Sequence, residues 1–297
     1  MRIFQRDKYI LKNKNLKVYL FLILPLIIYV TFFIIPNIKT IVYSFVEWDG
    51  INPVKKFIGI DNYRRLFGDS LFLKTLKNTI IYTTTIVVFD VTGGIVVATL
   101  IYKKTKTNIT FRTLIFLPAM ISSVAIGIIW SFMYDANVGA INFILEKLGI
   151  EFLQKHWLSD PKLAIFTVAS VHIWESFGYG VILFIAGLQD IPKEIYEAAK
   201  VDGVNNWQNF TRITIPLLKS TIALVWILST IFSFIAFDFV YVMTRGGADH
   251  SSEVLATYLY KQGFRYNNVG YSSAIATVLF SIVLIMAVFQ LRISKEY

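Results

Sequence analysis

Three carboxylates stand inside long apolar runs of this sequence, where a charged side chain is costly. Asp90, Glu175 and Asp238 each interrupt a run that is otherwise free of charge. A charge at the centre of a membrane helix costs on the order of 2.5–3.5 kcal/mol, so each acid must face a polar cavity, a partner or a boundary. Two roles stay open: accepting hydrogen bonds from a solute in a translocation cavity, or structural bonding to neighbouring hydroxyl and backbone groups. His172 precedes Glu175 by three residues and would share its helix face, which fits either role.

The runs that carry these acids are long enough to cross a membrane. The chain has 297 residues, of which 56% are hydrophobic and only 16% charged, whereas soluble domains carry about a quarter charged residues. Crossing the hydrocarbon core takes about 20 apolar residues, and unpaired backbone groups are not tolerated there, so non-alternating runs predict helices rather than barrel strands. The expected spans are residues 18–38, 78–102, 113–134, 163–189, 220–244 and 266–291. We therefore expect an all-α, polytopic membrane protein with six transmembrane helices.

Small residues recur every four positions in the third run. Ala119, Ser123, Gly127 and Ser131 would lie on one helix face, where a neighbouring backbone can approach closely. We expect a packing seam, which faces either another span of this chain or a second subunit, and we favour the first.

The basic residues indicate the orientation of the spans. With the N-terminus inside, the cytoplasmic segments carry 16 Lys or Arg and the outer segments 13, and six of them precede the first span. Residues flanking the first span count most, so we expect both termini in the cytoplasm. Most of the net charge of +10 then faces anionic lipid, and no basic stripe for nucleic acid is predicted.

This orientation fixes the predicted organisation of the chain. The first run is 21 residues long, contains Pro25 and lacks a small-x-small site after it, so we expect a retained helix rather than a cleaved signal. The predicted segments are a cytoplasmic N-terminus (1–17), a first transmembrane helix with an outer loop (18–74), a core of five spans (75–291) that includes a cytoplasmic loop (190–219), and a cytoplasmic tail (292–297).

Signals of catalysis are missing from the sequence. It has no Gly-Lys dipeptide, and therefore no Walker A loop to hold ATP phosphates. His156, His172 and His250 lack metal-ligand spacing, no serine sits in a nucleophile elbow, and there is no cysteine. We expect no catalytic site, no metal site and no cofactor bound by this chain.

The loop at 190–219 carries the most specific pattern. Pro192 can begin a helix and Gly203 can end it in a left-handed conformation. Asn205 and Gln208 have the spacing of a capping pair that starts a second helix. Each helix would have an apolar face that it cannot bury by itself, formed by Ile191, Ile195 and Ala198 in the first and by Trp207, Phe210 and Ile213 in the second. Such an element either lies in the lipid interface or docks into a groove of a partner.

The exact residues of this loop resemble a known pattern. Glu197-Ala198-Ala199, then Gly203 after three residues, then Ile213 after nine, with Ile215-Pro216 closing, resemble the EAA loop of ABC importer permeases (E-A-A-x3-G-x9-I-x-L-P). Ile215 replaces the leucine of the pattern and keeps its apolar volume. We call residues 190–219 the coupling loop.

The resemblance extends over nearly the whole chain. It is to the permeases typified by the glycerol-3-phosphate and maltose importers. The matching residues are Pro25, Pro36, Ser44-Phe45, Trp48, Phe111-Arg112-Thr113, Leu117-Pro118, Trp130, Gly139, Asn142, Thr244-Arg245-Gly246-Gly247, Tyr258, Tyr260, Phe264 and Gly270-Tyr271-Ser272-Ser273-Ala274.

The resemblance implies a type I ABC importer permease fold. It implies a subunit that imports a sugar, an oligosaccharide or a glycerol-phosphate-like solute by alternating access in the inner membrane of a prokaryote. The implied partners are a second, homologous permease subunit in a heterodimer, two ATP-binding subunits that use the ATP, an extracytoplasmic solute-binding protein and membrane lipid. Coupling to the ATPase would fall on Glu197, Ala198, Ala199, Asp202, Gly203, Ile213 and Pro216.

Two other functions compete with this interpretation. A secondary transporter or ion channel could use Asp90, Glu175 and Asp238 as a proton or ion relay, but it would need paired repeats with broken helices, and the sequence shows no such duplication. A membrane scaffold without transport is the other alternative.

Overall fold

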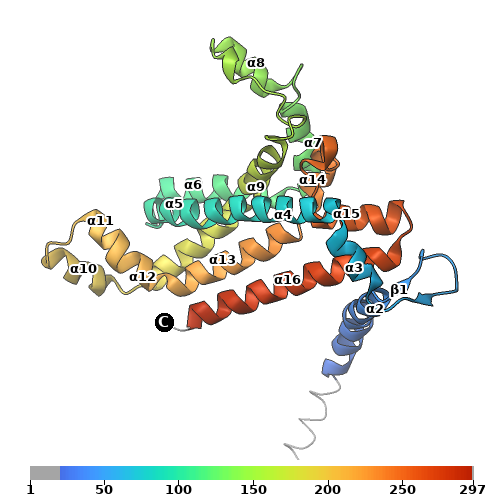
Figure 1. Ribbon diagram of the computed structural model, residues 1–297. Helices are drawn as coiled ribbons and strands as arrows, with labels where there is room; N and C mark the ends of the chain where they lie inside the picture. The colour runs from blue at the N-terminus through green and yellow to red at the C-terminus, as the bar shows by residue number, and fades with distance from the viewer. Residues whose placement is uncertain (1–20, 296–297) are drawn as a thin grey trace, which may run out of the picture. The chain divides into compact units, whose positions relative to one another are not determined.

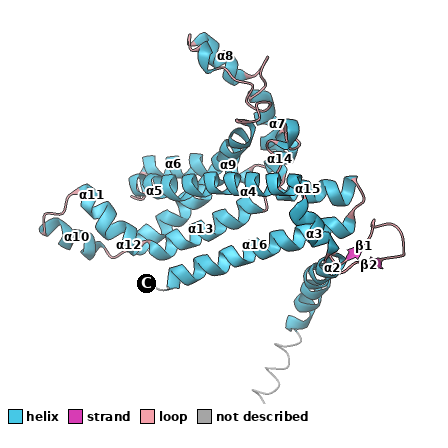
Figure 2. Cartoon of the chain, viewed as in Figure 1, coloured by secondary structure: helices cyan, strands magenta, loops and turns pink. Residues whose placement is uncertain are grey.

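The computed structural model describes residues 21–295, which are almost entirely helical (Figure 2). Five helices in this part of the chain are long and apolar enough to cross a membrane, or six if one bent pair counts as a single span. The five are Phe21–Tyr43, Ser70–Ile101, Ala164–Asp190, Lys219–Met243 and Val269–Ile293. The all-α membrane fold expected from the sequence is confirmed. The chain divides into two compact units, which are described separately.

The first unit contains residues 21–66 and 262–277 in the described range. Its helices are η1 (Val30–Ile34), α2 (Ile35–Tyr43), the start of α3 (Asp61–Gly68), most of η7 (Lys261–Arg265) and the start of α16 (Val269–Lys295). Between them, β1 (Val46–Glu47) and β2 (Lys56–Phe57) pair antiparallel, with Val46 opposite Phe57. The buried Asn62 donates to the carbonyls of Ser44 and Val46 at 2.9 and 3.0 Å. Its side chain therefore satisfies backbone carbonyls at this short hairpin that would otherwise need a neighbouring strand.

The second unit contains residues 67–261 and 278–295, and its core is a bundle of long helices (Figure 1). One span consists of α4 (Ser70–Val88), η2 (Phe89–Gly93) and α5 (Gly94–Ile101). It packs against α9 (Ala164–Asp190), which also contacts α6 (Lys106–Phe116) and α13 (Lys219–Phe234). With 27 residues, α9 is about 40 Å long. This length suffices to cross the hydrocarbon core.

Shorter helices lie at the two ends of α9 (Figure 1). Before it come α8 (Ala140–Lys147) and η4 (Glu151–Leu153), and after it α10 (Lys193–Val201), α11 (Asn206–Gln208), η5 (Asn209–Thr214) and α12 (Ile215–Leu217). The last four form the coupling loop. The unit also contains α14 (Asp238–Met243), η6 (Ala248–His250) and α15 (Leu255–Tyr260).

The third apolar run differs from the expected single helix over 113–134. The structure has α6, then the 3-10 segment η3 (Leu117–Met120), then α7 (Ser123–Met133), with a bend of 97°. Pro118 is the physical reason that α6 ends and a 3-10 segment follows, because proline has no N–H for the helical ladder and clashes with the preceding turn. Ile121 and Ser122 take extended or non-helical backbone angles, so the chain leaves the helix there and begins a new one.

This bend divides the seam of small residues. Ala119 lies in η3, before the bend, and so does not share a helix face with Ser123 and Gly127 in α7. A Cβ at Gly127 would lie 3.1 Å from the Val242 side chain of α14. The expected close approach within the chain is therefore confirmed at Gly127 and is wrong for Ala119.

Candidate functional site

The three acids of the apolar runs line a single cavity of about 550 Å³ in the second unit. Asp90 comes from η2, Glu175 from α9, and Asp238 from the first turn of α14. They are up to 148 positions apart in the sequence, and the packing of α9 against α4, α13 and α14 brings them together. Whether they contact a solute stays a prediction.

Asp90 is placed by an irregularity in its helix. It lies in the π-helical segment η2, and such single-turn insertions are frequent at functional sites. Although it is 96% buried, its Oδ2 accepts a hydrogen bond from Ser229 Oγ of α13 at 2.9 Å, and Ser176 Oγ of α9 lies 3.4 Å from both carboxylate oxygens. The carboxylate therefore joins three helices at the cavity wall.

Asp238 is positioned where a span is interrupted. Phe234 ends α13, the next three residues are not helical, and Asp238 begins α14. Its Oδ2 accepts a hydrogen bond from Ser123 Oγ at 2.8 Å. Because Ser123 begins α7 directly after the bend, the broken third run supplies the partner of this acid. Sequence reasoning placed Ser123 in a packing seam and missed this contact.

His172 and Glu175 share the cavity but do not form the structural pair that their spacing allowed. His172 Nδ1 lies 2.9 Å from the Tyr82 hydroxyl of α4, and both side chains are buried. Glu175 is half-buried and has no hydrogen-bond partner among the residues that the structure describes. Its carboxylate is therefore available to a molecule in the cavity.

Aromatic rings complete the wall of the cavity. Tyr179, Phe232, Phe237 and Phe239 line it, and Phe237 stacks on Tyr241 with ring centroids 4.8 Å apart. Exposed ring faces beside carboxylates and hydroxyls can hold a solute that has both apolar and hydroxyl-bearing surfaces. No signal in the sequence singled out these rings.

The coupling loop has the local structure that its sequence predicts. Gly203 ends α10 with φ +74°, a conformation that costs other residues about 1–2 kcal/mol. Asn205 caps the next helix, and its backbone and side chain exchange hydrogen bonds with Gln208 at 3.1 and 2.8 Å. The expected turn and capping pair are confirmed.

The coupling loop has one face on the bundle and one face away from it. Ala199 is buried, and Tyr196, Phe210 and Ile215 pack against a core cluster that includes Leu188 of α9. The Tyr196 hydroxyl also lies 3.3 Å from Thr214 Oγ1, which links the two halves of the loop.

The other face is open. Val201 and Trp207 are 88% and 72% exposed, and Ile195, Glu197 and Ala198 are exposed as well. Glu197 has no ion-pair or hydrogen-bond partner within the described residues. A charged residue beside exposed apolar side chains is the composition of a protein-docking surface.

A buried ion cluster, which sequence reasoning missed, holds the segment before η7. Glu253 is completely buried, pairs with Lys261 Nζ at 2.7 Å and contacts His250 Nδ1. Asn78 of α4 donates to the carbonyls of His250 and Glu253, both at 3.0 Å. The three-residue spacing of His250 and Glu253 was the available signal, but the burial of Glu253 depends on α4. The contacts tie residues 250–261 to that helix.

Comparison with known proteins identifies the family. Residues 90–296 match the model of the binding-protein-dependent transport system inner membrane component. The chain is 37% identical to "Probable ABC transporter permease protein YurN" of Bacillus subtilis (93% of this chain, 95% of that protein) and 34% identical to the multiple sugar-binding transport system permease protein MsmF of Streptococcus mutans (93% and 94%). These matches favour an ABC permease over the secondary transporter or channel considered above.

The fold agrees with the same family. One chain in the crystal structure of a bacterial ABC transporter involved in the import of the acidic polysaccharide alginate superposes with a TM-score of 0.83, covering 100% of this chain and 99% of the other at 23% identity. The expected type I importer permease fold is thereby confirmed. The chain described here is a multi-pass membrane protein and belongs to the family of binding-protein-dependent transport system inner membrane components.

Proposed function

We propose that this chain is a permease subunit of an ABC importer for carbohydrates and that the cavity is part of its translocation path. The observation that carries the proposal is the combination, in one unit, of a cavity lined by carboxylates, hydroxyls and aromatic rings with an exposed coupling loop. The sugar-transport name of MsmF supports the solute class. Sugars are recognised by carboxylate oxygens, which accept hydrogen bonds from sugar hydroxyls, and by the faces of aromatic rings.

The driving reaction takes place on other subunits. Family membership supports a membrane component without its own ATPase site, and the sequence lacks a Walker A loop. In the proposed complex, two ATP-binding subunits bind and hydrolyse ATP, and one of them receives the exposed face of the coupling loop. Glu197 offers a charged hydrogen bond to that subunit, while Ala198 leaves room for close helix approach.

The remaining partners are a second, homologous permease subunit in a heterodimer and an extracytoplasmic binding protein. The alginate transporter has also been solved in complex with a pentasaccharide-bound periplasmic protein, which supports a binding protein as the donor of solute here. With both termini in the cytoplasm, the coupling loop faces the ATP-binding subunits, and α8 lies at the outer end.

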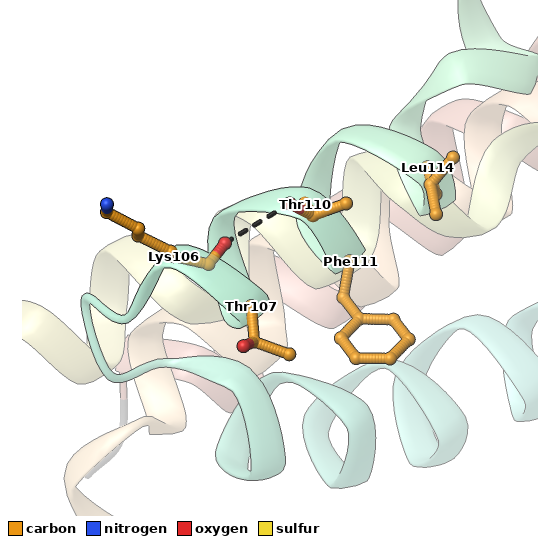
Figure 3. A pocket seen from close by; sticks show the side chains of 5 residues that line it. All are labelled: Lys106, Thr107, Thr110, Phe111 and Leu114. Atoms are coloured by element: carbon orange, nitrogen blue, oxygen red, sulfur yellow. Dashed lines mark hydrogen bonds between the residues drawn. The ribbon is translucent and has the colours of Figure 1, made fainter.

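Membrane lipid is the proposed neighbour of α6. A shallow hollow of about 410 Å³ follows its first turns (Figure 3). Lys106 lies at one end of it and the exposed Phe111 and Leu114 at the other. This order suits a phosphate headgroup above acyl chains at the inner membrane surface.

Reconstitution with an exchanged charge tests the function. The permease pair and its ATP-binding subunits are placed in liposomes with the binding protein, and ATP-dependent uptake of labelled sugars is measured. We expect Glu197→Lys to lower uptake and solute-stimulated ATP hydrolysis by at least about tenfold, or about 1.4 kcal/mol.

Glu146→Lys is the matched control, because Glu146 is also exposed but lies in α8. It should leave both activities unchanged. Sugar flux without ATP or without the ATP-binding subunits would refute the proposal.

A further inference from the structure

The charge of the cavity is opposite to that of the chain. The chain has 29 Lys and Arg against 19 Asp and Glu. Of the 18 described residues that line the cavity, three are acids and none is Lys or Arg. The excess of positive charge is therefore kept out of the one site where three membrane-embedded acids meet.

Along the chain, the cations nearest to Asp90 and Glu175 are far away, whereas Asp238 lies seven residues before Arg245, which is not among the residues that line the cavity. Asp90 lies 13 residues from both Lys77 and Lys103, and Glu175 lies 13 residues after Lys162. At 1.5 Å per residue, the separations of Asp90 and Glu175 from these lysines are about 20 Å along the helix axis. Low-dielectric walls also concentrate the field of charges that line a cleft.

The three serine hydroxyls that line the cavity are already directed at two of the acids. Ser229 and Ser176 donate to Asp90, and Ser123 donates to Asp238. These donors are therefore not available to stabilise an anionic group on a solute. Glu175 keeps free acceptor oxygens among the described contacts, and a carboxylate accepts from hydroxyl or ammonium groups but not from phosphate or carboxylate groups.

We infer that this cavity selects solutes by charge: it admits neutral carbohydrates and those that bear an ammonium group, and it rejects those that bear phosphate or carboxylate groups. The inference rests on the proposed function and narrows its solute class. It removes glycerol-phosphate-like solutes from the range that the sequence resemblance allowed. Ring faces such as those of Tyr179 and Phe237 can stack on a sugar of either admitted kind.

The sequence offers a direct assay, because the chain contains no cysteine. Ala236, a small residue of the cavity wall outside the hydrogen-bonded groups, is replaced in an Ala236→Cys variant of the full complex. Thiol-modifying methanethiosulfonates of similar size, one cationic, one neutral and one anionic, are then added. Intact mass of this chain reports its rate of modification by each reagent.

A control position corrects for the intrinsic reactivity of the reagents. Leu148→Cys serves this purpose, because Leu148 is 67% exposed at the end of α8 and follows one acid and one base, Glu146 and Lys147. We expect the cationic-to-anionic rate ratio at position 236 to exceed the ratio at position 148 by at least about tenfold. A ratio equal to that of the control would overturn the inference.

A second variant shows whether the acids cause the selectivity. Glu175→Gln retains the size of the side chain and breaks no described hydrogen bond, so the complex should assemble normally. In the Ala236→Cys background it should lower the rate ratio at least about threefold. An unchanged ratio would show that Glu175 does not contribute to the field and would refute its assigned part.

Uptake separates this inference from the proposed function. In liposomes, neutral or amino sugars should be transported, whereas their phosphorylated or uronic counterparts should neither be transported nor compete. If neutral sugar is taken up but the rate ratio at position 236 equals that at position 148, the charge selectivity is refuted and the proposed function is not. The opposite outcome is a cationic-to-anionic rate ratio that depends on Glu175, with no ATP-driven uptake of any carbohydrate. It would refute the proposed function and leave the cationic preference of the cavity intact.

Discussion

Replacing Trp207 by alanine tests whether the exposed face of the coupling loop docks against a protein. Trp207 lies in α11 and is 72% exposed, although its ring also contacts Phe210 at 6.1 Å between centroids. An apolar side chain of this size on an amphipathic helix lies either in the lipid interface or in the groove of a partner. The two possibilities give opposite results in a binding assay.

The expected effect follows from the exposed area. A tryptophan buries up to about 250 Å², so 72% exposure leaves about 180 Å² for the partner. At about 25 cal/mol per Å², this area corresponds to about 4.5 kcal/mol, from which about 1 kcal/mol is lost by ordering the side chain. Partial burial in the complex lowers the value further. We expect Trp207→Ala to weaken binding by about 2–3 kcal/mol, or about 30- to 150-fold.

The assay measures the dissociation constant of an ATP-binding subunit for the permease in lipid nanodiscs. Phe152→Ala is the control, since Phe152 is 75% exposed but lies in η4, in the segment before α9. The control should bind the ATP-binding subunit like the unchanged chain. Wild-type affinity of Trp207→Ala, together with weaker partitioning of the loop into lipid, would refute docking through this residue and place the ring in the membrane interface.

Three other substitutions test the loop, the ion cluster and the exposed pair of Lys74 and Asp249. Gly203→Val should lower ATPase coupling, measured as solute-stimulated ATP hydrolysis, because a branched residue at φ +74° costs about 1–2 kcal/mol; Gly149→Val, also at positive φ but next to α8, should leave coupling intact. Glu253→Gln should lower the free energy of unfolding by about 3–5 kcal/mol, because it leaves Lys261 without its buried counter-charge; Asp61→Asn breaks an exposed pair with Arg64 and should cost less than about 1 kcal/mol in the same denaturation experiment. The hydrogen bond and charge of Lys74 lower the pKa of the exposed Asp249 below its ordinary value of 3.8. This contact therefore contributes above pH 3.8 and is lost as the pH falls through the lowered pKa. Once the contact is lost, η6 should loosen and be cleaved faster by a protease. Lys74→Met should abolish this acid dependence of the cleavage rate. Identical pH profiles of cleavage for the variant and the unchanged chain would contradict the assignment.

Features set by neighbouring residues could be predicted from the sequence. The turn at Gly203 and the cap at Asn205 depend on backbone angles and hydrogen bonds within four residues, so their spacing was sufficient. The apolar runs indicated the spans for the same reason, because the energy of membrane insertion is summed along a continuous segment.

Features that depend on distant segments could not be predicted. The cost of burying Asp90, Glu175 and Asp238 indicated that each needs polar surroundings, but not that they share one cavity. The bend after Pro118 had a local signal in the proline, yet its angle of 97° depends on how α7 packs against α14. Burial of Glu253 likewise depends on α4, more than 170 residues earlier in the chain.

Three helices connect the coupling loop to the polar cavity. Leu218, directly before α13, packs in the core cluster that also holds Phe210 of the loop, and Ser229, eleven residues later, donates to Asp90. On α9, Leu188 contacts the same cluster, and Ser176 lies twelve residues before it. These separations are about 16–18 Å along the helix axes. Because packed cores move as units rather than deforming continuously, displacement of the loop must shift α5, α9 and α13 together. The hydrogen bonds of Asp90 join η2, which leads into α5, to α9 and α13, so a difference between the movements of these helices would strain those contacts in the cavity.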